Sequence, residues 1–371
     1  MGTEIIIPAI DPMPLPAPFW LFKVLLVLTF ILHIVVMNFM FGGGLIAVWT
    51  RFFGQKNDKD QRLFKDIVPK IPSLLAATVT LGIAPLLFVQ VLYGQFLYTS
   101  SIIMAWPWFL VLVLLVLAYY GFYIVSFNKD KKSRSIGWLM LISVFFIFLV
   151  GFFYSNNFTL MNTPSSWAAK YFHDPSGWNL NLSETTLIPR FLHFLVASIA
   201  IGSFLLIIIG LFRWKREQDY ARFLIVRGGK WFMYATMVQF LVGIWFLISL
   251  PRELMLQFMG GNMLGTVSLL ISILGGLASI FVMSNGIRNE DPRKPAIWAM
   301  GITGIVVVFM AIMRDILRTA YLSPYFKSSD LVVKTQLDVL ILFLVLFVIG
   351  IAVWVLMIKK YFFTPSARAA D

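Results

Sequence analysis

The side chains that could bind a metal centre are few in this chain of 371 residues. It contains three histidines and no cysteine, which excludes Cys-ligated zinc, a Cys-held iron–sulfur cluster and the covalent attachment of a c-type haem. His33 and His193 lie inside long apolar segments, whereas His173 lies in a polar one. A neutral imidazole in apolar surroundings is typical of a haem ligand. We therefore expect His193 and His33 to ligate haem iron, with packing as the alternative, and His173 to be a solvated loop residue.

Met263 offers a thioether ligand at the membrane depth expected for His193. A His/Met axial pair raises the reduction potential of a haem relative to ligation without Met. Arg190 lies one turn before His193, where it could pair with a haem propionate or anchor the helix at the interface. Most of the 17 methionines are expected to be packing residues. Four of them lie near the same membrane face as Met263 and compete for its role: Met255, Met259, Met310 and Met313.

The elements that position these residues are membrane helices. Hydrophobic residues make up 60% of the chain and charged residues 13%, against about 25% charged residues in soluble domains. The apolar runs are continuous and do not alternate, which argues against a transmembrane β-barrel. At about 20 residues per span, the sequence predicts an all-α, polytopic membrane protein. The nine predicted spans are 19–49, 71–98, 103–127, 136–155, 188–212, 231–250, 263–286, 295–316 and 335–358.

The distribution of lysine and arginine predicts the orientation of the bundle. One set of loops carries 22 of the 30 Lys and Arg residues, and the opposite set carries seven. Because cytoplasmic loops hold the excess of positive charge, we expect the N-terminus outside and the C-terminus in the cytoplasm. The net charge of +13 is then mainly a topology signal, and we expect no nucleic acid as a partner. The expected location is the cytoplasmic (inner) membrane of a bacterium or archaeon.

The chain is expected to form one membrane domain, 19–371, after a proline-rich external leader, 1–18. Two external loops stand out, the polar segment 156–187 and the shorter 251–262. No internal repeat supports a transporter of the inverted-repeat type. The acidic residues lie almost entirely outside the apolar segments, so no proton relay is expected at the middle of the membrane.

Four segments resemble subunit I of the cytochrome bd-type quinol oxidases. Residues 32–36, which include His33, resemble the opening helix whose His ligates a haem of the oxygen-reducing site. Residues 190–197 resemble the helix whose His ligates the low-spin haem b. Residues 262–265 (Asn-Met-Leu-Gly) are similar to an Arg-x-Met-x-Gly segment whose Met is the other low-spin ligand, and residues 317–320 resemble a Leu-Arg-Thr segment. The resemblance implies one or two b haems, with His193 and Met263 as an axial pair and His33 at a second haem.

The departures from that family concern its oxygen-reducing site, one residue beside the low-spin methionine and the quinol loop. Gln90 stands where the family has a Glu that ligates a high-spin haem, and the segment 103–127 lacks the acidic residues that conduct protons in the family. Gly261 replaces the Arg that precedes the low-spin Met. The quinol loop is reduced to about a dozen residues, with Arg252 and Glu253 as its only charges. The low-spin site is therefore expected to be retained and oxygen reduction to be lost.

These features together predict a haem b-containing membrane subunit of a respiratory complex that exchanges electrons between quinol or quinone and a partner redox protein. Arg252 and Glu253 are the candidate quinol site. The expected partners are membrane lipid, quinone, other membrane subunits and an external cytochrome c or iron–sulfur protein. Three alternatives remain open. They are a haem-free membrane anchor of a redox complex, a bd-like quinol oxidase with altered ligation at Gln90, and a small-molecule transporter.

Overall fold

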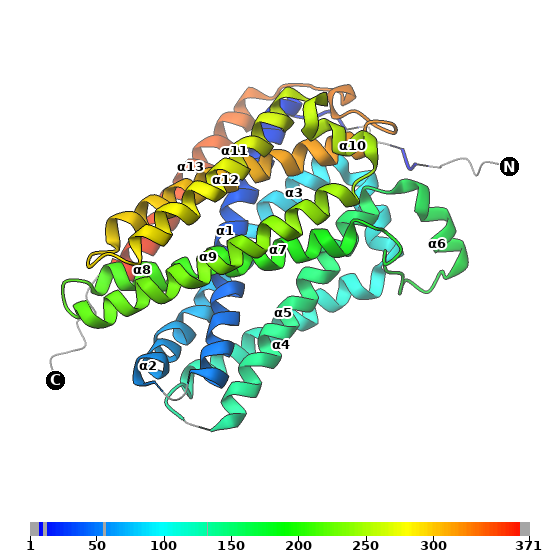
Figure 1. Cartoon of the computed structure of the whole chain (residues 1–371). Coiled ribbons are helices and arrows are strands. Elements are labelled where there is room, and N and C mark those ends of the chain that lie inside the picture. Colours follow the sequence, from blue (N-terminus) through cyan, green and yellow to red (C-terminus); the bar gives the residue numbers. More distant parts are fainter. Residues whose placement is uncertain (1–6, 10–12, 55–56, 132, 364–371) are drawn as a thin grey trace.

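The protein is a bundle of long helices (Figure 1). The computed structural model describes residues 7–9, 13–54, 57–131 and 133–363. Within these residues, nine helices or pairs of continuous helices are long and apolar enough to cross a membrane, which confirms the predicted fold class. They are α1 (Phe19–Phe53), α2 with α3 (Asp58–Ile67 and Ile71–Ile103), α4 (Ala105–Phe127), α5 (Arg134–Met161), α7 with α8 (Leu187–Gly202 and Phe204–Arg213), α9 (Gln218–Ser249), α11 (Met263–Gly286), α12 (Arg293–Leu322) and α13 (Leu337–Phe363).

The remaining helices are short and lie in the connections. On the external side, as the Lys and Arg distribution orients the bundle, α6 and α10 lie toward the same end of the molecule, opposite α2 (Figure 1). Their bounds, with the 3₁₀ and π turns, are α6 (Trp167–His173), α10 (Arg252–Leu256), Val68–Lys70, Pro164–Ser166, Gln257–Gly261 and Ser328–Asp330.

Several helices extend beyond the apolar runs that predicted them. Helix α5 continues to Met161, so residues 156–161 of the expected loop 156–187 are helical. The rest of that loop folds back on the bundle, where Trp167 donates its indole N–H to the Leu160 carbonyl oxygen at 2.8 Å. Helix α12 continues to Leu322, six residues past the predicted end. Side chains expected in external loops are thereby placed inside the bundle.

Helix α1 lies at the centre of the bundle and contacts α3, α5 and α7. At its crossing with α7, a Cβ atom added to Gly42 would lie 1.8 Å from the Ser198 carbonyl oxygen, and one added to Gly202 would lie 2.6 Å from the Gly42 Cα. The two backbones touch here because neither glycine carries a side chain, as is common where membrane helices pack. This contact accounts for the small residues at both positions.

Part of the proline-rich leader pairs with the segment before α13. Leu15 donates its backbone N–H to the Val332 carbonyl oxygen at 2.8 Å, and Lys334 donates to the Leu15 carbonyl oxygen at 2.9 Å. Leu15 and Ala17 are buried. Residues 1–6 and 10–12 of the leader lie outside the described residues.

Candidate functional site

His193 lies in the second turn of α7 and faces α9. Its ring centroid is 6.0 Å from that of Phe246, and a Cβ atom added to Gly243 would lie 3.4 Å from the His193 Cε1. Gly243 therefore lets the two helices hold the imidazole between them. The Nδ1 atom of His193 is buried and has no hydrogen-bond partner within the described residues.

Two further polar side chains lie on the two helices that hold this imidazole. Arg190, one turn earlier on α7, places its guanidinium carbon 5.2 Å from the ring centre of Phe246 and 5.8 Å from that of Tyr321 on α12. Gln239 lies one turn before Gly243 on α9. The Arg190 Nε, both amide atoms of Gln239 and the Tyr321 hydroxyl are buried without a hydrogen-bond partner in the part of the chain that is described. Unpaired polar atoms of α7 and α9 therefore lie within about one helical turn of His193 or of its neighbour Gly243.

Among the candidate methionine ligands, Met263 lies at the surface, whereas Met255 and Met313 pack near Phe246. Met263 is the first residue of α11, and its side chain is 84% exposed. The imidazole of His193 instead has its ring neighbours on α9. Met255 and Met313 pack with Phe246 in one apolar cluster, built around Leu250, Phe258 and Leu317. In this structure the methionines that share a cluster with the neighbour of His193 are therefore Met255 and Met313.

His33 is held between α1 and α3. Its Nδ1 lies 3.0 Å from the Thr78 carbonyl oxygen, which can only accept, so Nδ1 carries the proton and donates. This tautomer leaves the lone pair on Nε2, as in histidines that bind metals through one nitrogen and a carbonyl through the other. A Cβ atom added to Gly82 would lie 2.9 Å from the His33 Cε1, so glycine makes room for the ring. Gln90 lies two turns beyond Gly82 and is partly buried.

A charged cluster joins α1 to α12 near the external end. Lys23 donates to the Thr319 hydroxyl at 3.0 Å and lies 3.5 Å from the Asp315 carboxylate. Arg318 lies 3.5 Å from the other oxygen of Asp315, and its side chain is only 4% exposed. One carboxylate therefore faces two cations inside the bundle.

Two arginines of this region stack on aromatic rings. The guanidinium carbon of Arg314 lies 4.2 Å from the ring centre of Phe30 and 5.1 Å from that of Phe158. That of Arg318 lies 5.5 Å from the ring centre of Tyr93, where α3 departs from helical geometry (φ −140°, ψ 31°). Aromatic faces stabilise a desolvated cation without neutralising it, so the cations in this part of the bundle outnumber the carboxylates.

Sequence reasoning missed this charged cluster because Arg318 lies beyond the predicted span 295–316 and Arg314 was counted with the external cations. The available signal was the spacing of Arg314, Asp315 and Arg318 directly after an apolar run, which places all three within one helical turn of each other. Lys23 inside the first apolar segment was the second signal, since charges within membrane spans are usually functional or paired.

The predicted quinol residues lie on the surface. Arg252 and Glu253 open α10, and both are exposed. The next residues, Leu254 and Met255, pack into the apolar cluster that contains Phe246. Apolar contacts therefore connect α10 with the neighbour of His193. His173 is exposed at the end of α6, as expected of a solvated residue.

Comparison with known proteins places this architecture. No protein-family model and no curated protein matches the chain. Among solved structures, a chain of the bd oxidase from Geobacillus thermodenitrificans has a TM-score of 0.73 with this one, over 95% of this chain and 100% of that chain. The chain has a bd-oxidase fold. At 16% sequence identity the likeness concerns the fold, and it confirms the predicted resemblance at that level.

Proposed function

We propose that this chain is a haem b-containing membrane subunit of a respiratory complex in the cytoplasmic (inner) membrane of a bacterium or archaeon. It transfers electrons between membrane quinol and a partner redox protein, and it does not reduce oxygen itself. The bd-oxidase fold supports a quinol-oxidase-like subunit of a respiratory membrane complex. The finer assignment to haem b depends on the residues around His193.

The observation that carries the proposal is the set of buried, unpaired polar atoms at His193, Arg190 and Gln239. A buried polar atom without a partner costs about 1–3 kcal/mol, so three such side chains on the contacting helices α7 and α9 favour a ligand that pairs with them. A haem b fits this donor set, because its iron accepts an imidazole nitrogen and its propionates accept N–H groups. His193 would hold the iron and Arg190 a propionate. When bound, the haem supplies one-electron transfer.

A second haem is proposed at His33. The hydrogen bond to the Thr78 carbonyl supports it, because it orients the ring and leaves Nε2 available for a metal. The cationic excess at Lys23, Arg314 and Arg318 supports it further, since propionates are carboxylates that arginine binds in bidentate geometry. In this arrangement Asp315 holds Lys23 and Arg318 in position.

The second axial ligand at the His193 haem is proposed to be a methionine sulfur. Met263 was predicted from its depth and from the resemblance. Its exposure means that this residue reaches His193 only if the first turn of α11 turns inward. Met255 and Met313 instead pack in the apolar cluster of Phe246, the ring neighbour of His193. Both alternatives preserve His/Met ligation and its raised reduction potential.

The quinol site is proposed at Arg252 and Glu253, on the external side of the bundle. Glu253 accepts the proton of the quinol hydroxyl, and the Arg252 guanidinium favours the negative charge that develops on the quinol oxygen. Because both residues are exposed, the proton leaves to the external medium. An external cytochrome c or iron–sulfur protein receives the electrons, and other membrane subunits complete the complex.

The absence of oxygen reduction is inferred from Gln90 and from α4. A neutral amide is a poor substitute for a carboxylate as a haem ligand. Helix α4 (Ala105–Phe127) contains no Asp or Glu that could deliver the protons that oxygen reduction consumes.

A visible spectrum of the purified full chain tests the proposal. We expect a b-type α-band in the reduced-minus-oxidised spectrum and one or two haems per chain by pyridine haemochrome. His193→Ala should lose one haem, whereas the matched control His173→Ala, an exposed histidine, should lose none. Equal haem content in both variants, or a featureless spectrum from folded wild-type protein, would contradict the proposal and favour the haem-free anchor. Quinol-dependent oxygen consumption would instead favour an oxidase with altered ligation.

A further inference from the structure

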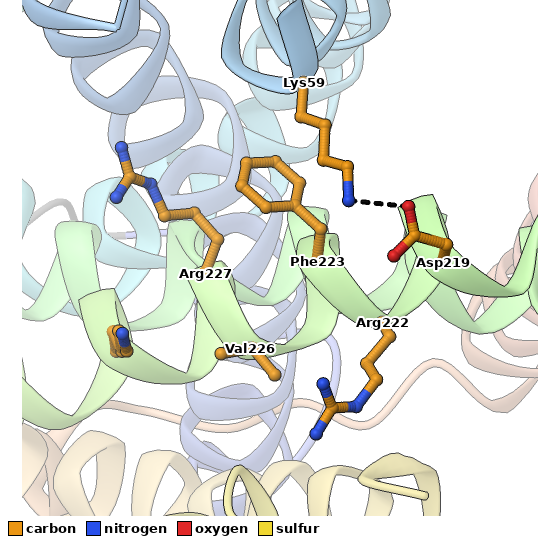
Figure 2. Close-up of a pocket in the computed structure, with 7 residues that line it drawn as sticks. Lys59, Asp219, Arg222, Phe223, Val226 and Arg227 are labelled. Carbon is orange, nitrogen blue, oxygen red and sulfur yellow. Dashed lines mark hydrogen bonds and ion pairs between the residues drawn. The ribbon is translucent and has the colours of Figure 1, made fainter. Parts of the chain in front are cut away.

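A basic pocket lies at the N-terminal, cytoplasmic end of α9, at the opposite end of this helix from Phe246. Its volume is about 280 Å³. Figure 2 shows Lys59 approaching α9 from α2 on the side where Phe223 lies, while Arg222 points to the opposite side of α9. Arg227 lies one turn after Phe223 and also lines the pocket. Asp219, Val226 and Lys230 complete the lining. Four cations and one carboxylate therefore line this pocket.

The cations of the pocket differ in how they are neutralised. Lys59 pairs with Asp219 at 2.6 Å, and Arg227 pairs with the buried Asp60 at 3.2 Å. Arg222 instead donates to the backbone carbonyls of Asn289 and Glu290, both at 3.2 Å, which orient the guanidinium without neutralising it.

Lys230 has no hydrogen bond or ion pair with any of the residues described. Neither Arg222 nor Lys230 therefore has a carboxylate partner among the described residues.

Two carboxylates of this region are engaged by other side chains. Asp66 accepts from Arg213 at 2.7 Å and from Tyr220 at 2.8 Å. Hydrogen bonds from the Arg293 side chain lower the pKa of Asp291 to about 2, so this carboxylate is ionised and committed to Arg293. The positive charge of the pocket is thus not cancelled by these neighbouring acids.

The pocket lies at the level of the lipid headgroups. Helix α9 has 32 residues, about a dozen more than a membrane span requires. Its polar first part, 218–230, must therefore project beyond the hydrocarbon on the cytoplasmic side. Lys230 is followed by Trp231, whose ring packs edge to face on Trp49 with the ring centres 5.7 Å apart. Tryptophan is enriched at the membrane interface, which places Lys230 at this boundary.

An exposed apolar face of α9 continues from the pocket into the membrane. Side chains at helical spacing after Lys230 are largely exposed, including Tyr234 (64%), Leu241 (70%) and Ile248 (68%). Val226 and Phe223 give the pocket itself an apolar wall. A ligand that fits this arrangement has an anionic head for the pocket and apolar chains for the helix face.

We propose that the pocket binds the phosphate headgroup of an anionic phospholipid of the cytoplasmic leaflet. Arg222 and Lys230 contact the phosphate, Lys59 and Arg227 add to the local positive potential, and the acyl chains lie along the exposed face of α9. Arginine suits this role because its planar guanidinium binds phosphate oxygens in pairs. The site is independent of the haem and quinol assignments.

Native mass spectrometry of the delipidated full chain in dodecyl maltoside tests the proposal. The two probes are dioleoylphosphatidylglycerol, which is anionic, and dioleoylphosphatidylcholine, which is zwitterionic. We expect preferential binding of phosphatidylglycerol. Each basic residue near a membrane surface changes binding about fivefold, so Arg222→Gln/Lys230→Gln should weaken it about thirtyfold while phosphatidylcholine binding stays unchanged.

A matched control removes the same charge elsewhere on the cytoplasmic side. Arg134 and Lys215 are exposed and outside the pocket, so Arg134→Gln/Lys215→Gln should leave the preference for phosphatidylglycerol within about twofold of wild type. Arg222→Lys/Lys230→Arg, which keeps both charges, should restore binding. Should the double glutamine variant fold poorly by circular dichroism, Lys230→Gln alone should still weaken binding about fivefold.

Three results would overturn the proposal. One is equal binding of the two lipids by the wild-type chain. Another is an equal loss in the Arg134→Gln/Lys215→Gln control, which would mean that overall surface charge attracts the lipid. The third is displacement of phosphatidylglycerol by about 10 mM inorganic phosphate or glycerol phosphate in wild type, which would identify a site for a free soluble phosphate.

Discussion

Substituting Gly42 by alanine would place a methyl group against the backbone of α7. The added Cβ would lie 1.8 Å from the Ser198 carbonyl oxygen, about 1.6 Å short of the 3.4 Å at which ordinary contact begins. A backbone oxygen within a helix cannot rotate away as a side chain can, so α1 and α7 must separate. Overpacking of this kind costs about 1–3 kcal/mol, and the rigid partner places Gly42→Ala at the upper end.

The intrinsic effect of the substitution has the opposite sign. Alanine stabilises a helix interior by roughly 1 kcal/mol relative to glycine. The net expectation for Gly42→Ala is therefore a loss of about 2 kcal/mol. Gly304 on α12 is the matched control, because a Cβ atom there would meet nothing within 4 Å, so Gly304→Ala should be neutral or slightly stabilising.

Unfolding in mixed micelles measures the difference. The full chain in dodecyl maltoside is titrated with sodium dodecyl sulfate, and the fluorescence of its 12 tryptophans reports unfolding. Gly42→Ala should unfold at a clearly lower detergent fraction than Gly304→Ala. Because His33 and His193 lie on the two helices that cross here, Gly42→Ala should also lower the haem content. Equal stability of the two variants would refute the close α1–α7 crossing.

The remaining predictions concern the charged cluster, the quinol site and the second haem ligand. Lys23→Met should destabilise the chain by about 1–3 kcal/mol, because it leaves the partly buried Asp315 with Arg318 as its remaining cation. Lys23→Met/Asp315→Asn should then cost clearly less than the sum of the single variants, and additive losses would show that the two side chains do not interact. Glu253→Gln should slow quinol-dependent haem reduction, measured by stopped flow, by about 100-fold, with the cytoplasmic Glu290→Gln as a neutral control; an unchanged rate would remove Glu253 from the proposal. The second haem ligand is identified by replacing each candidate methionine with leucine, in the variants Met263→Leu, Met255→Leu and Met313→Leu. One of these variants should lose the low-spin α-band. Survival of the band in all three would contradict His/Met ligation.

Much of the fold was predictable because a bilayer makes the sequence signal strong. A continuous apolar run of about 20 residues has few stable alternatives to a membrane helix, and each predicted span corresponds to a helix among the described residues. The ends of the helices were less predictable. Helix α12 passes the end of its apolar run, where Arg318 lies near Asp315 of the same helix and over the ring of Tyr93, a residue far away in the chain.

The candidate site was predictable in part. His33 and His193 were found because an imidazole is conspicuous among apolar residues. The neighbours of His193 were not, since Gln239 and Phe246 lie on another helix, and nothing local distinguishes them from other residues of α9. The predicted partner Met263 matched His193 in depth, but depth along the membrane normal says nothing about which way a side chain points around its helix.

The amino-acid sequence alone determined the number of membrane helices, the ends of the bundle that are rich in lysine and arginine, and the small set of side chains able to ligate a haem. These features depend on the transfer of each residue between water and lipid, which is a local property. The tertiary structure alone decided which of those side chains meet, that Gly42 and Gly202 form a helix crossing, and that Arg222 and Lys230 share a pocket with Lys59 of α2. These features depend on the rotation of each helix about its own axis, and that rotation is set by packing against partners distant in the sequence.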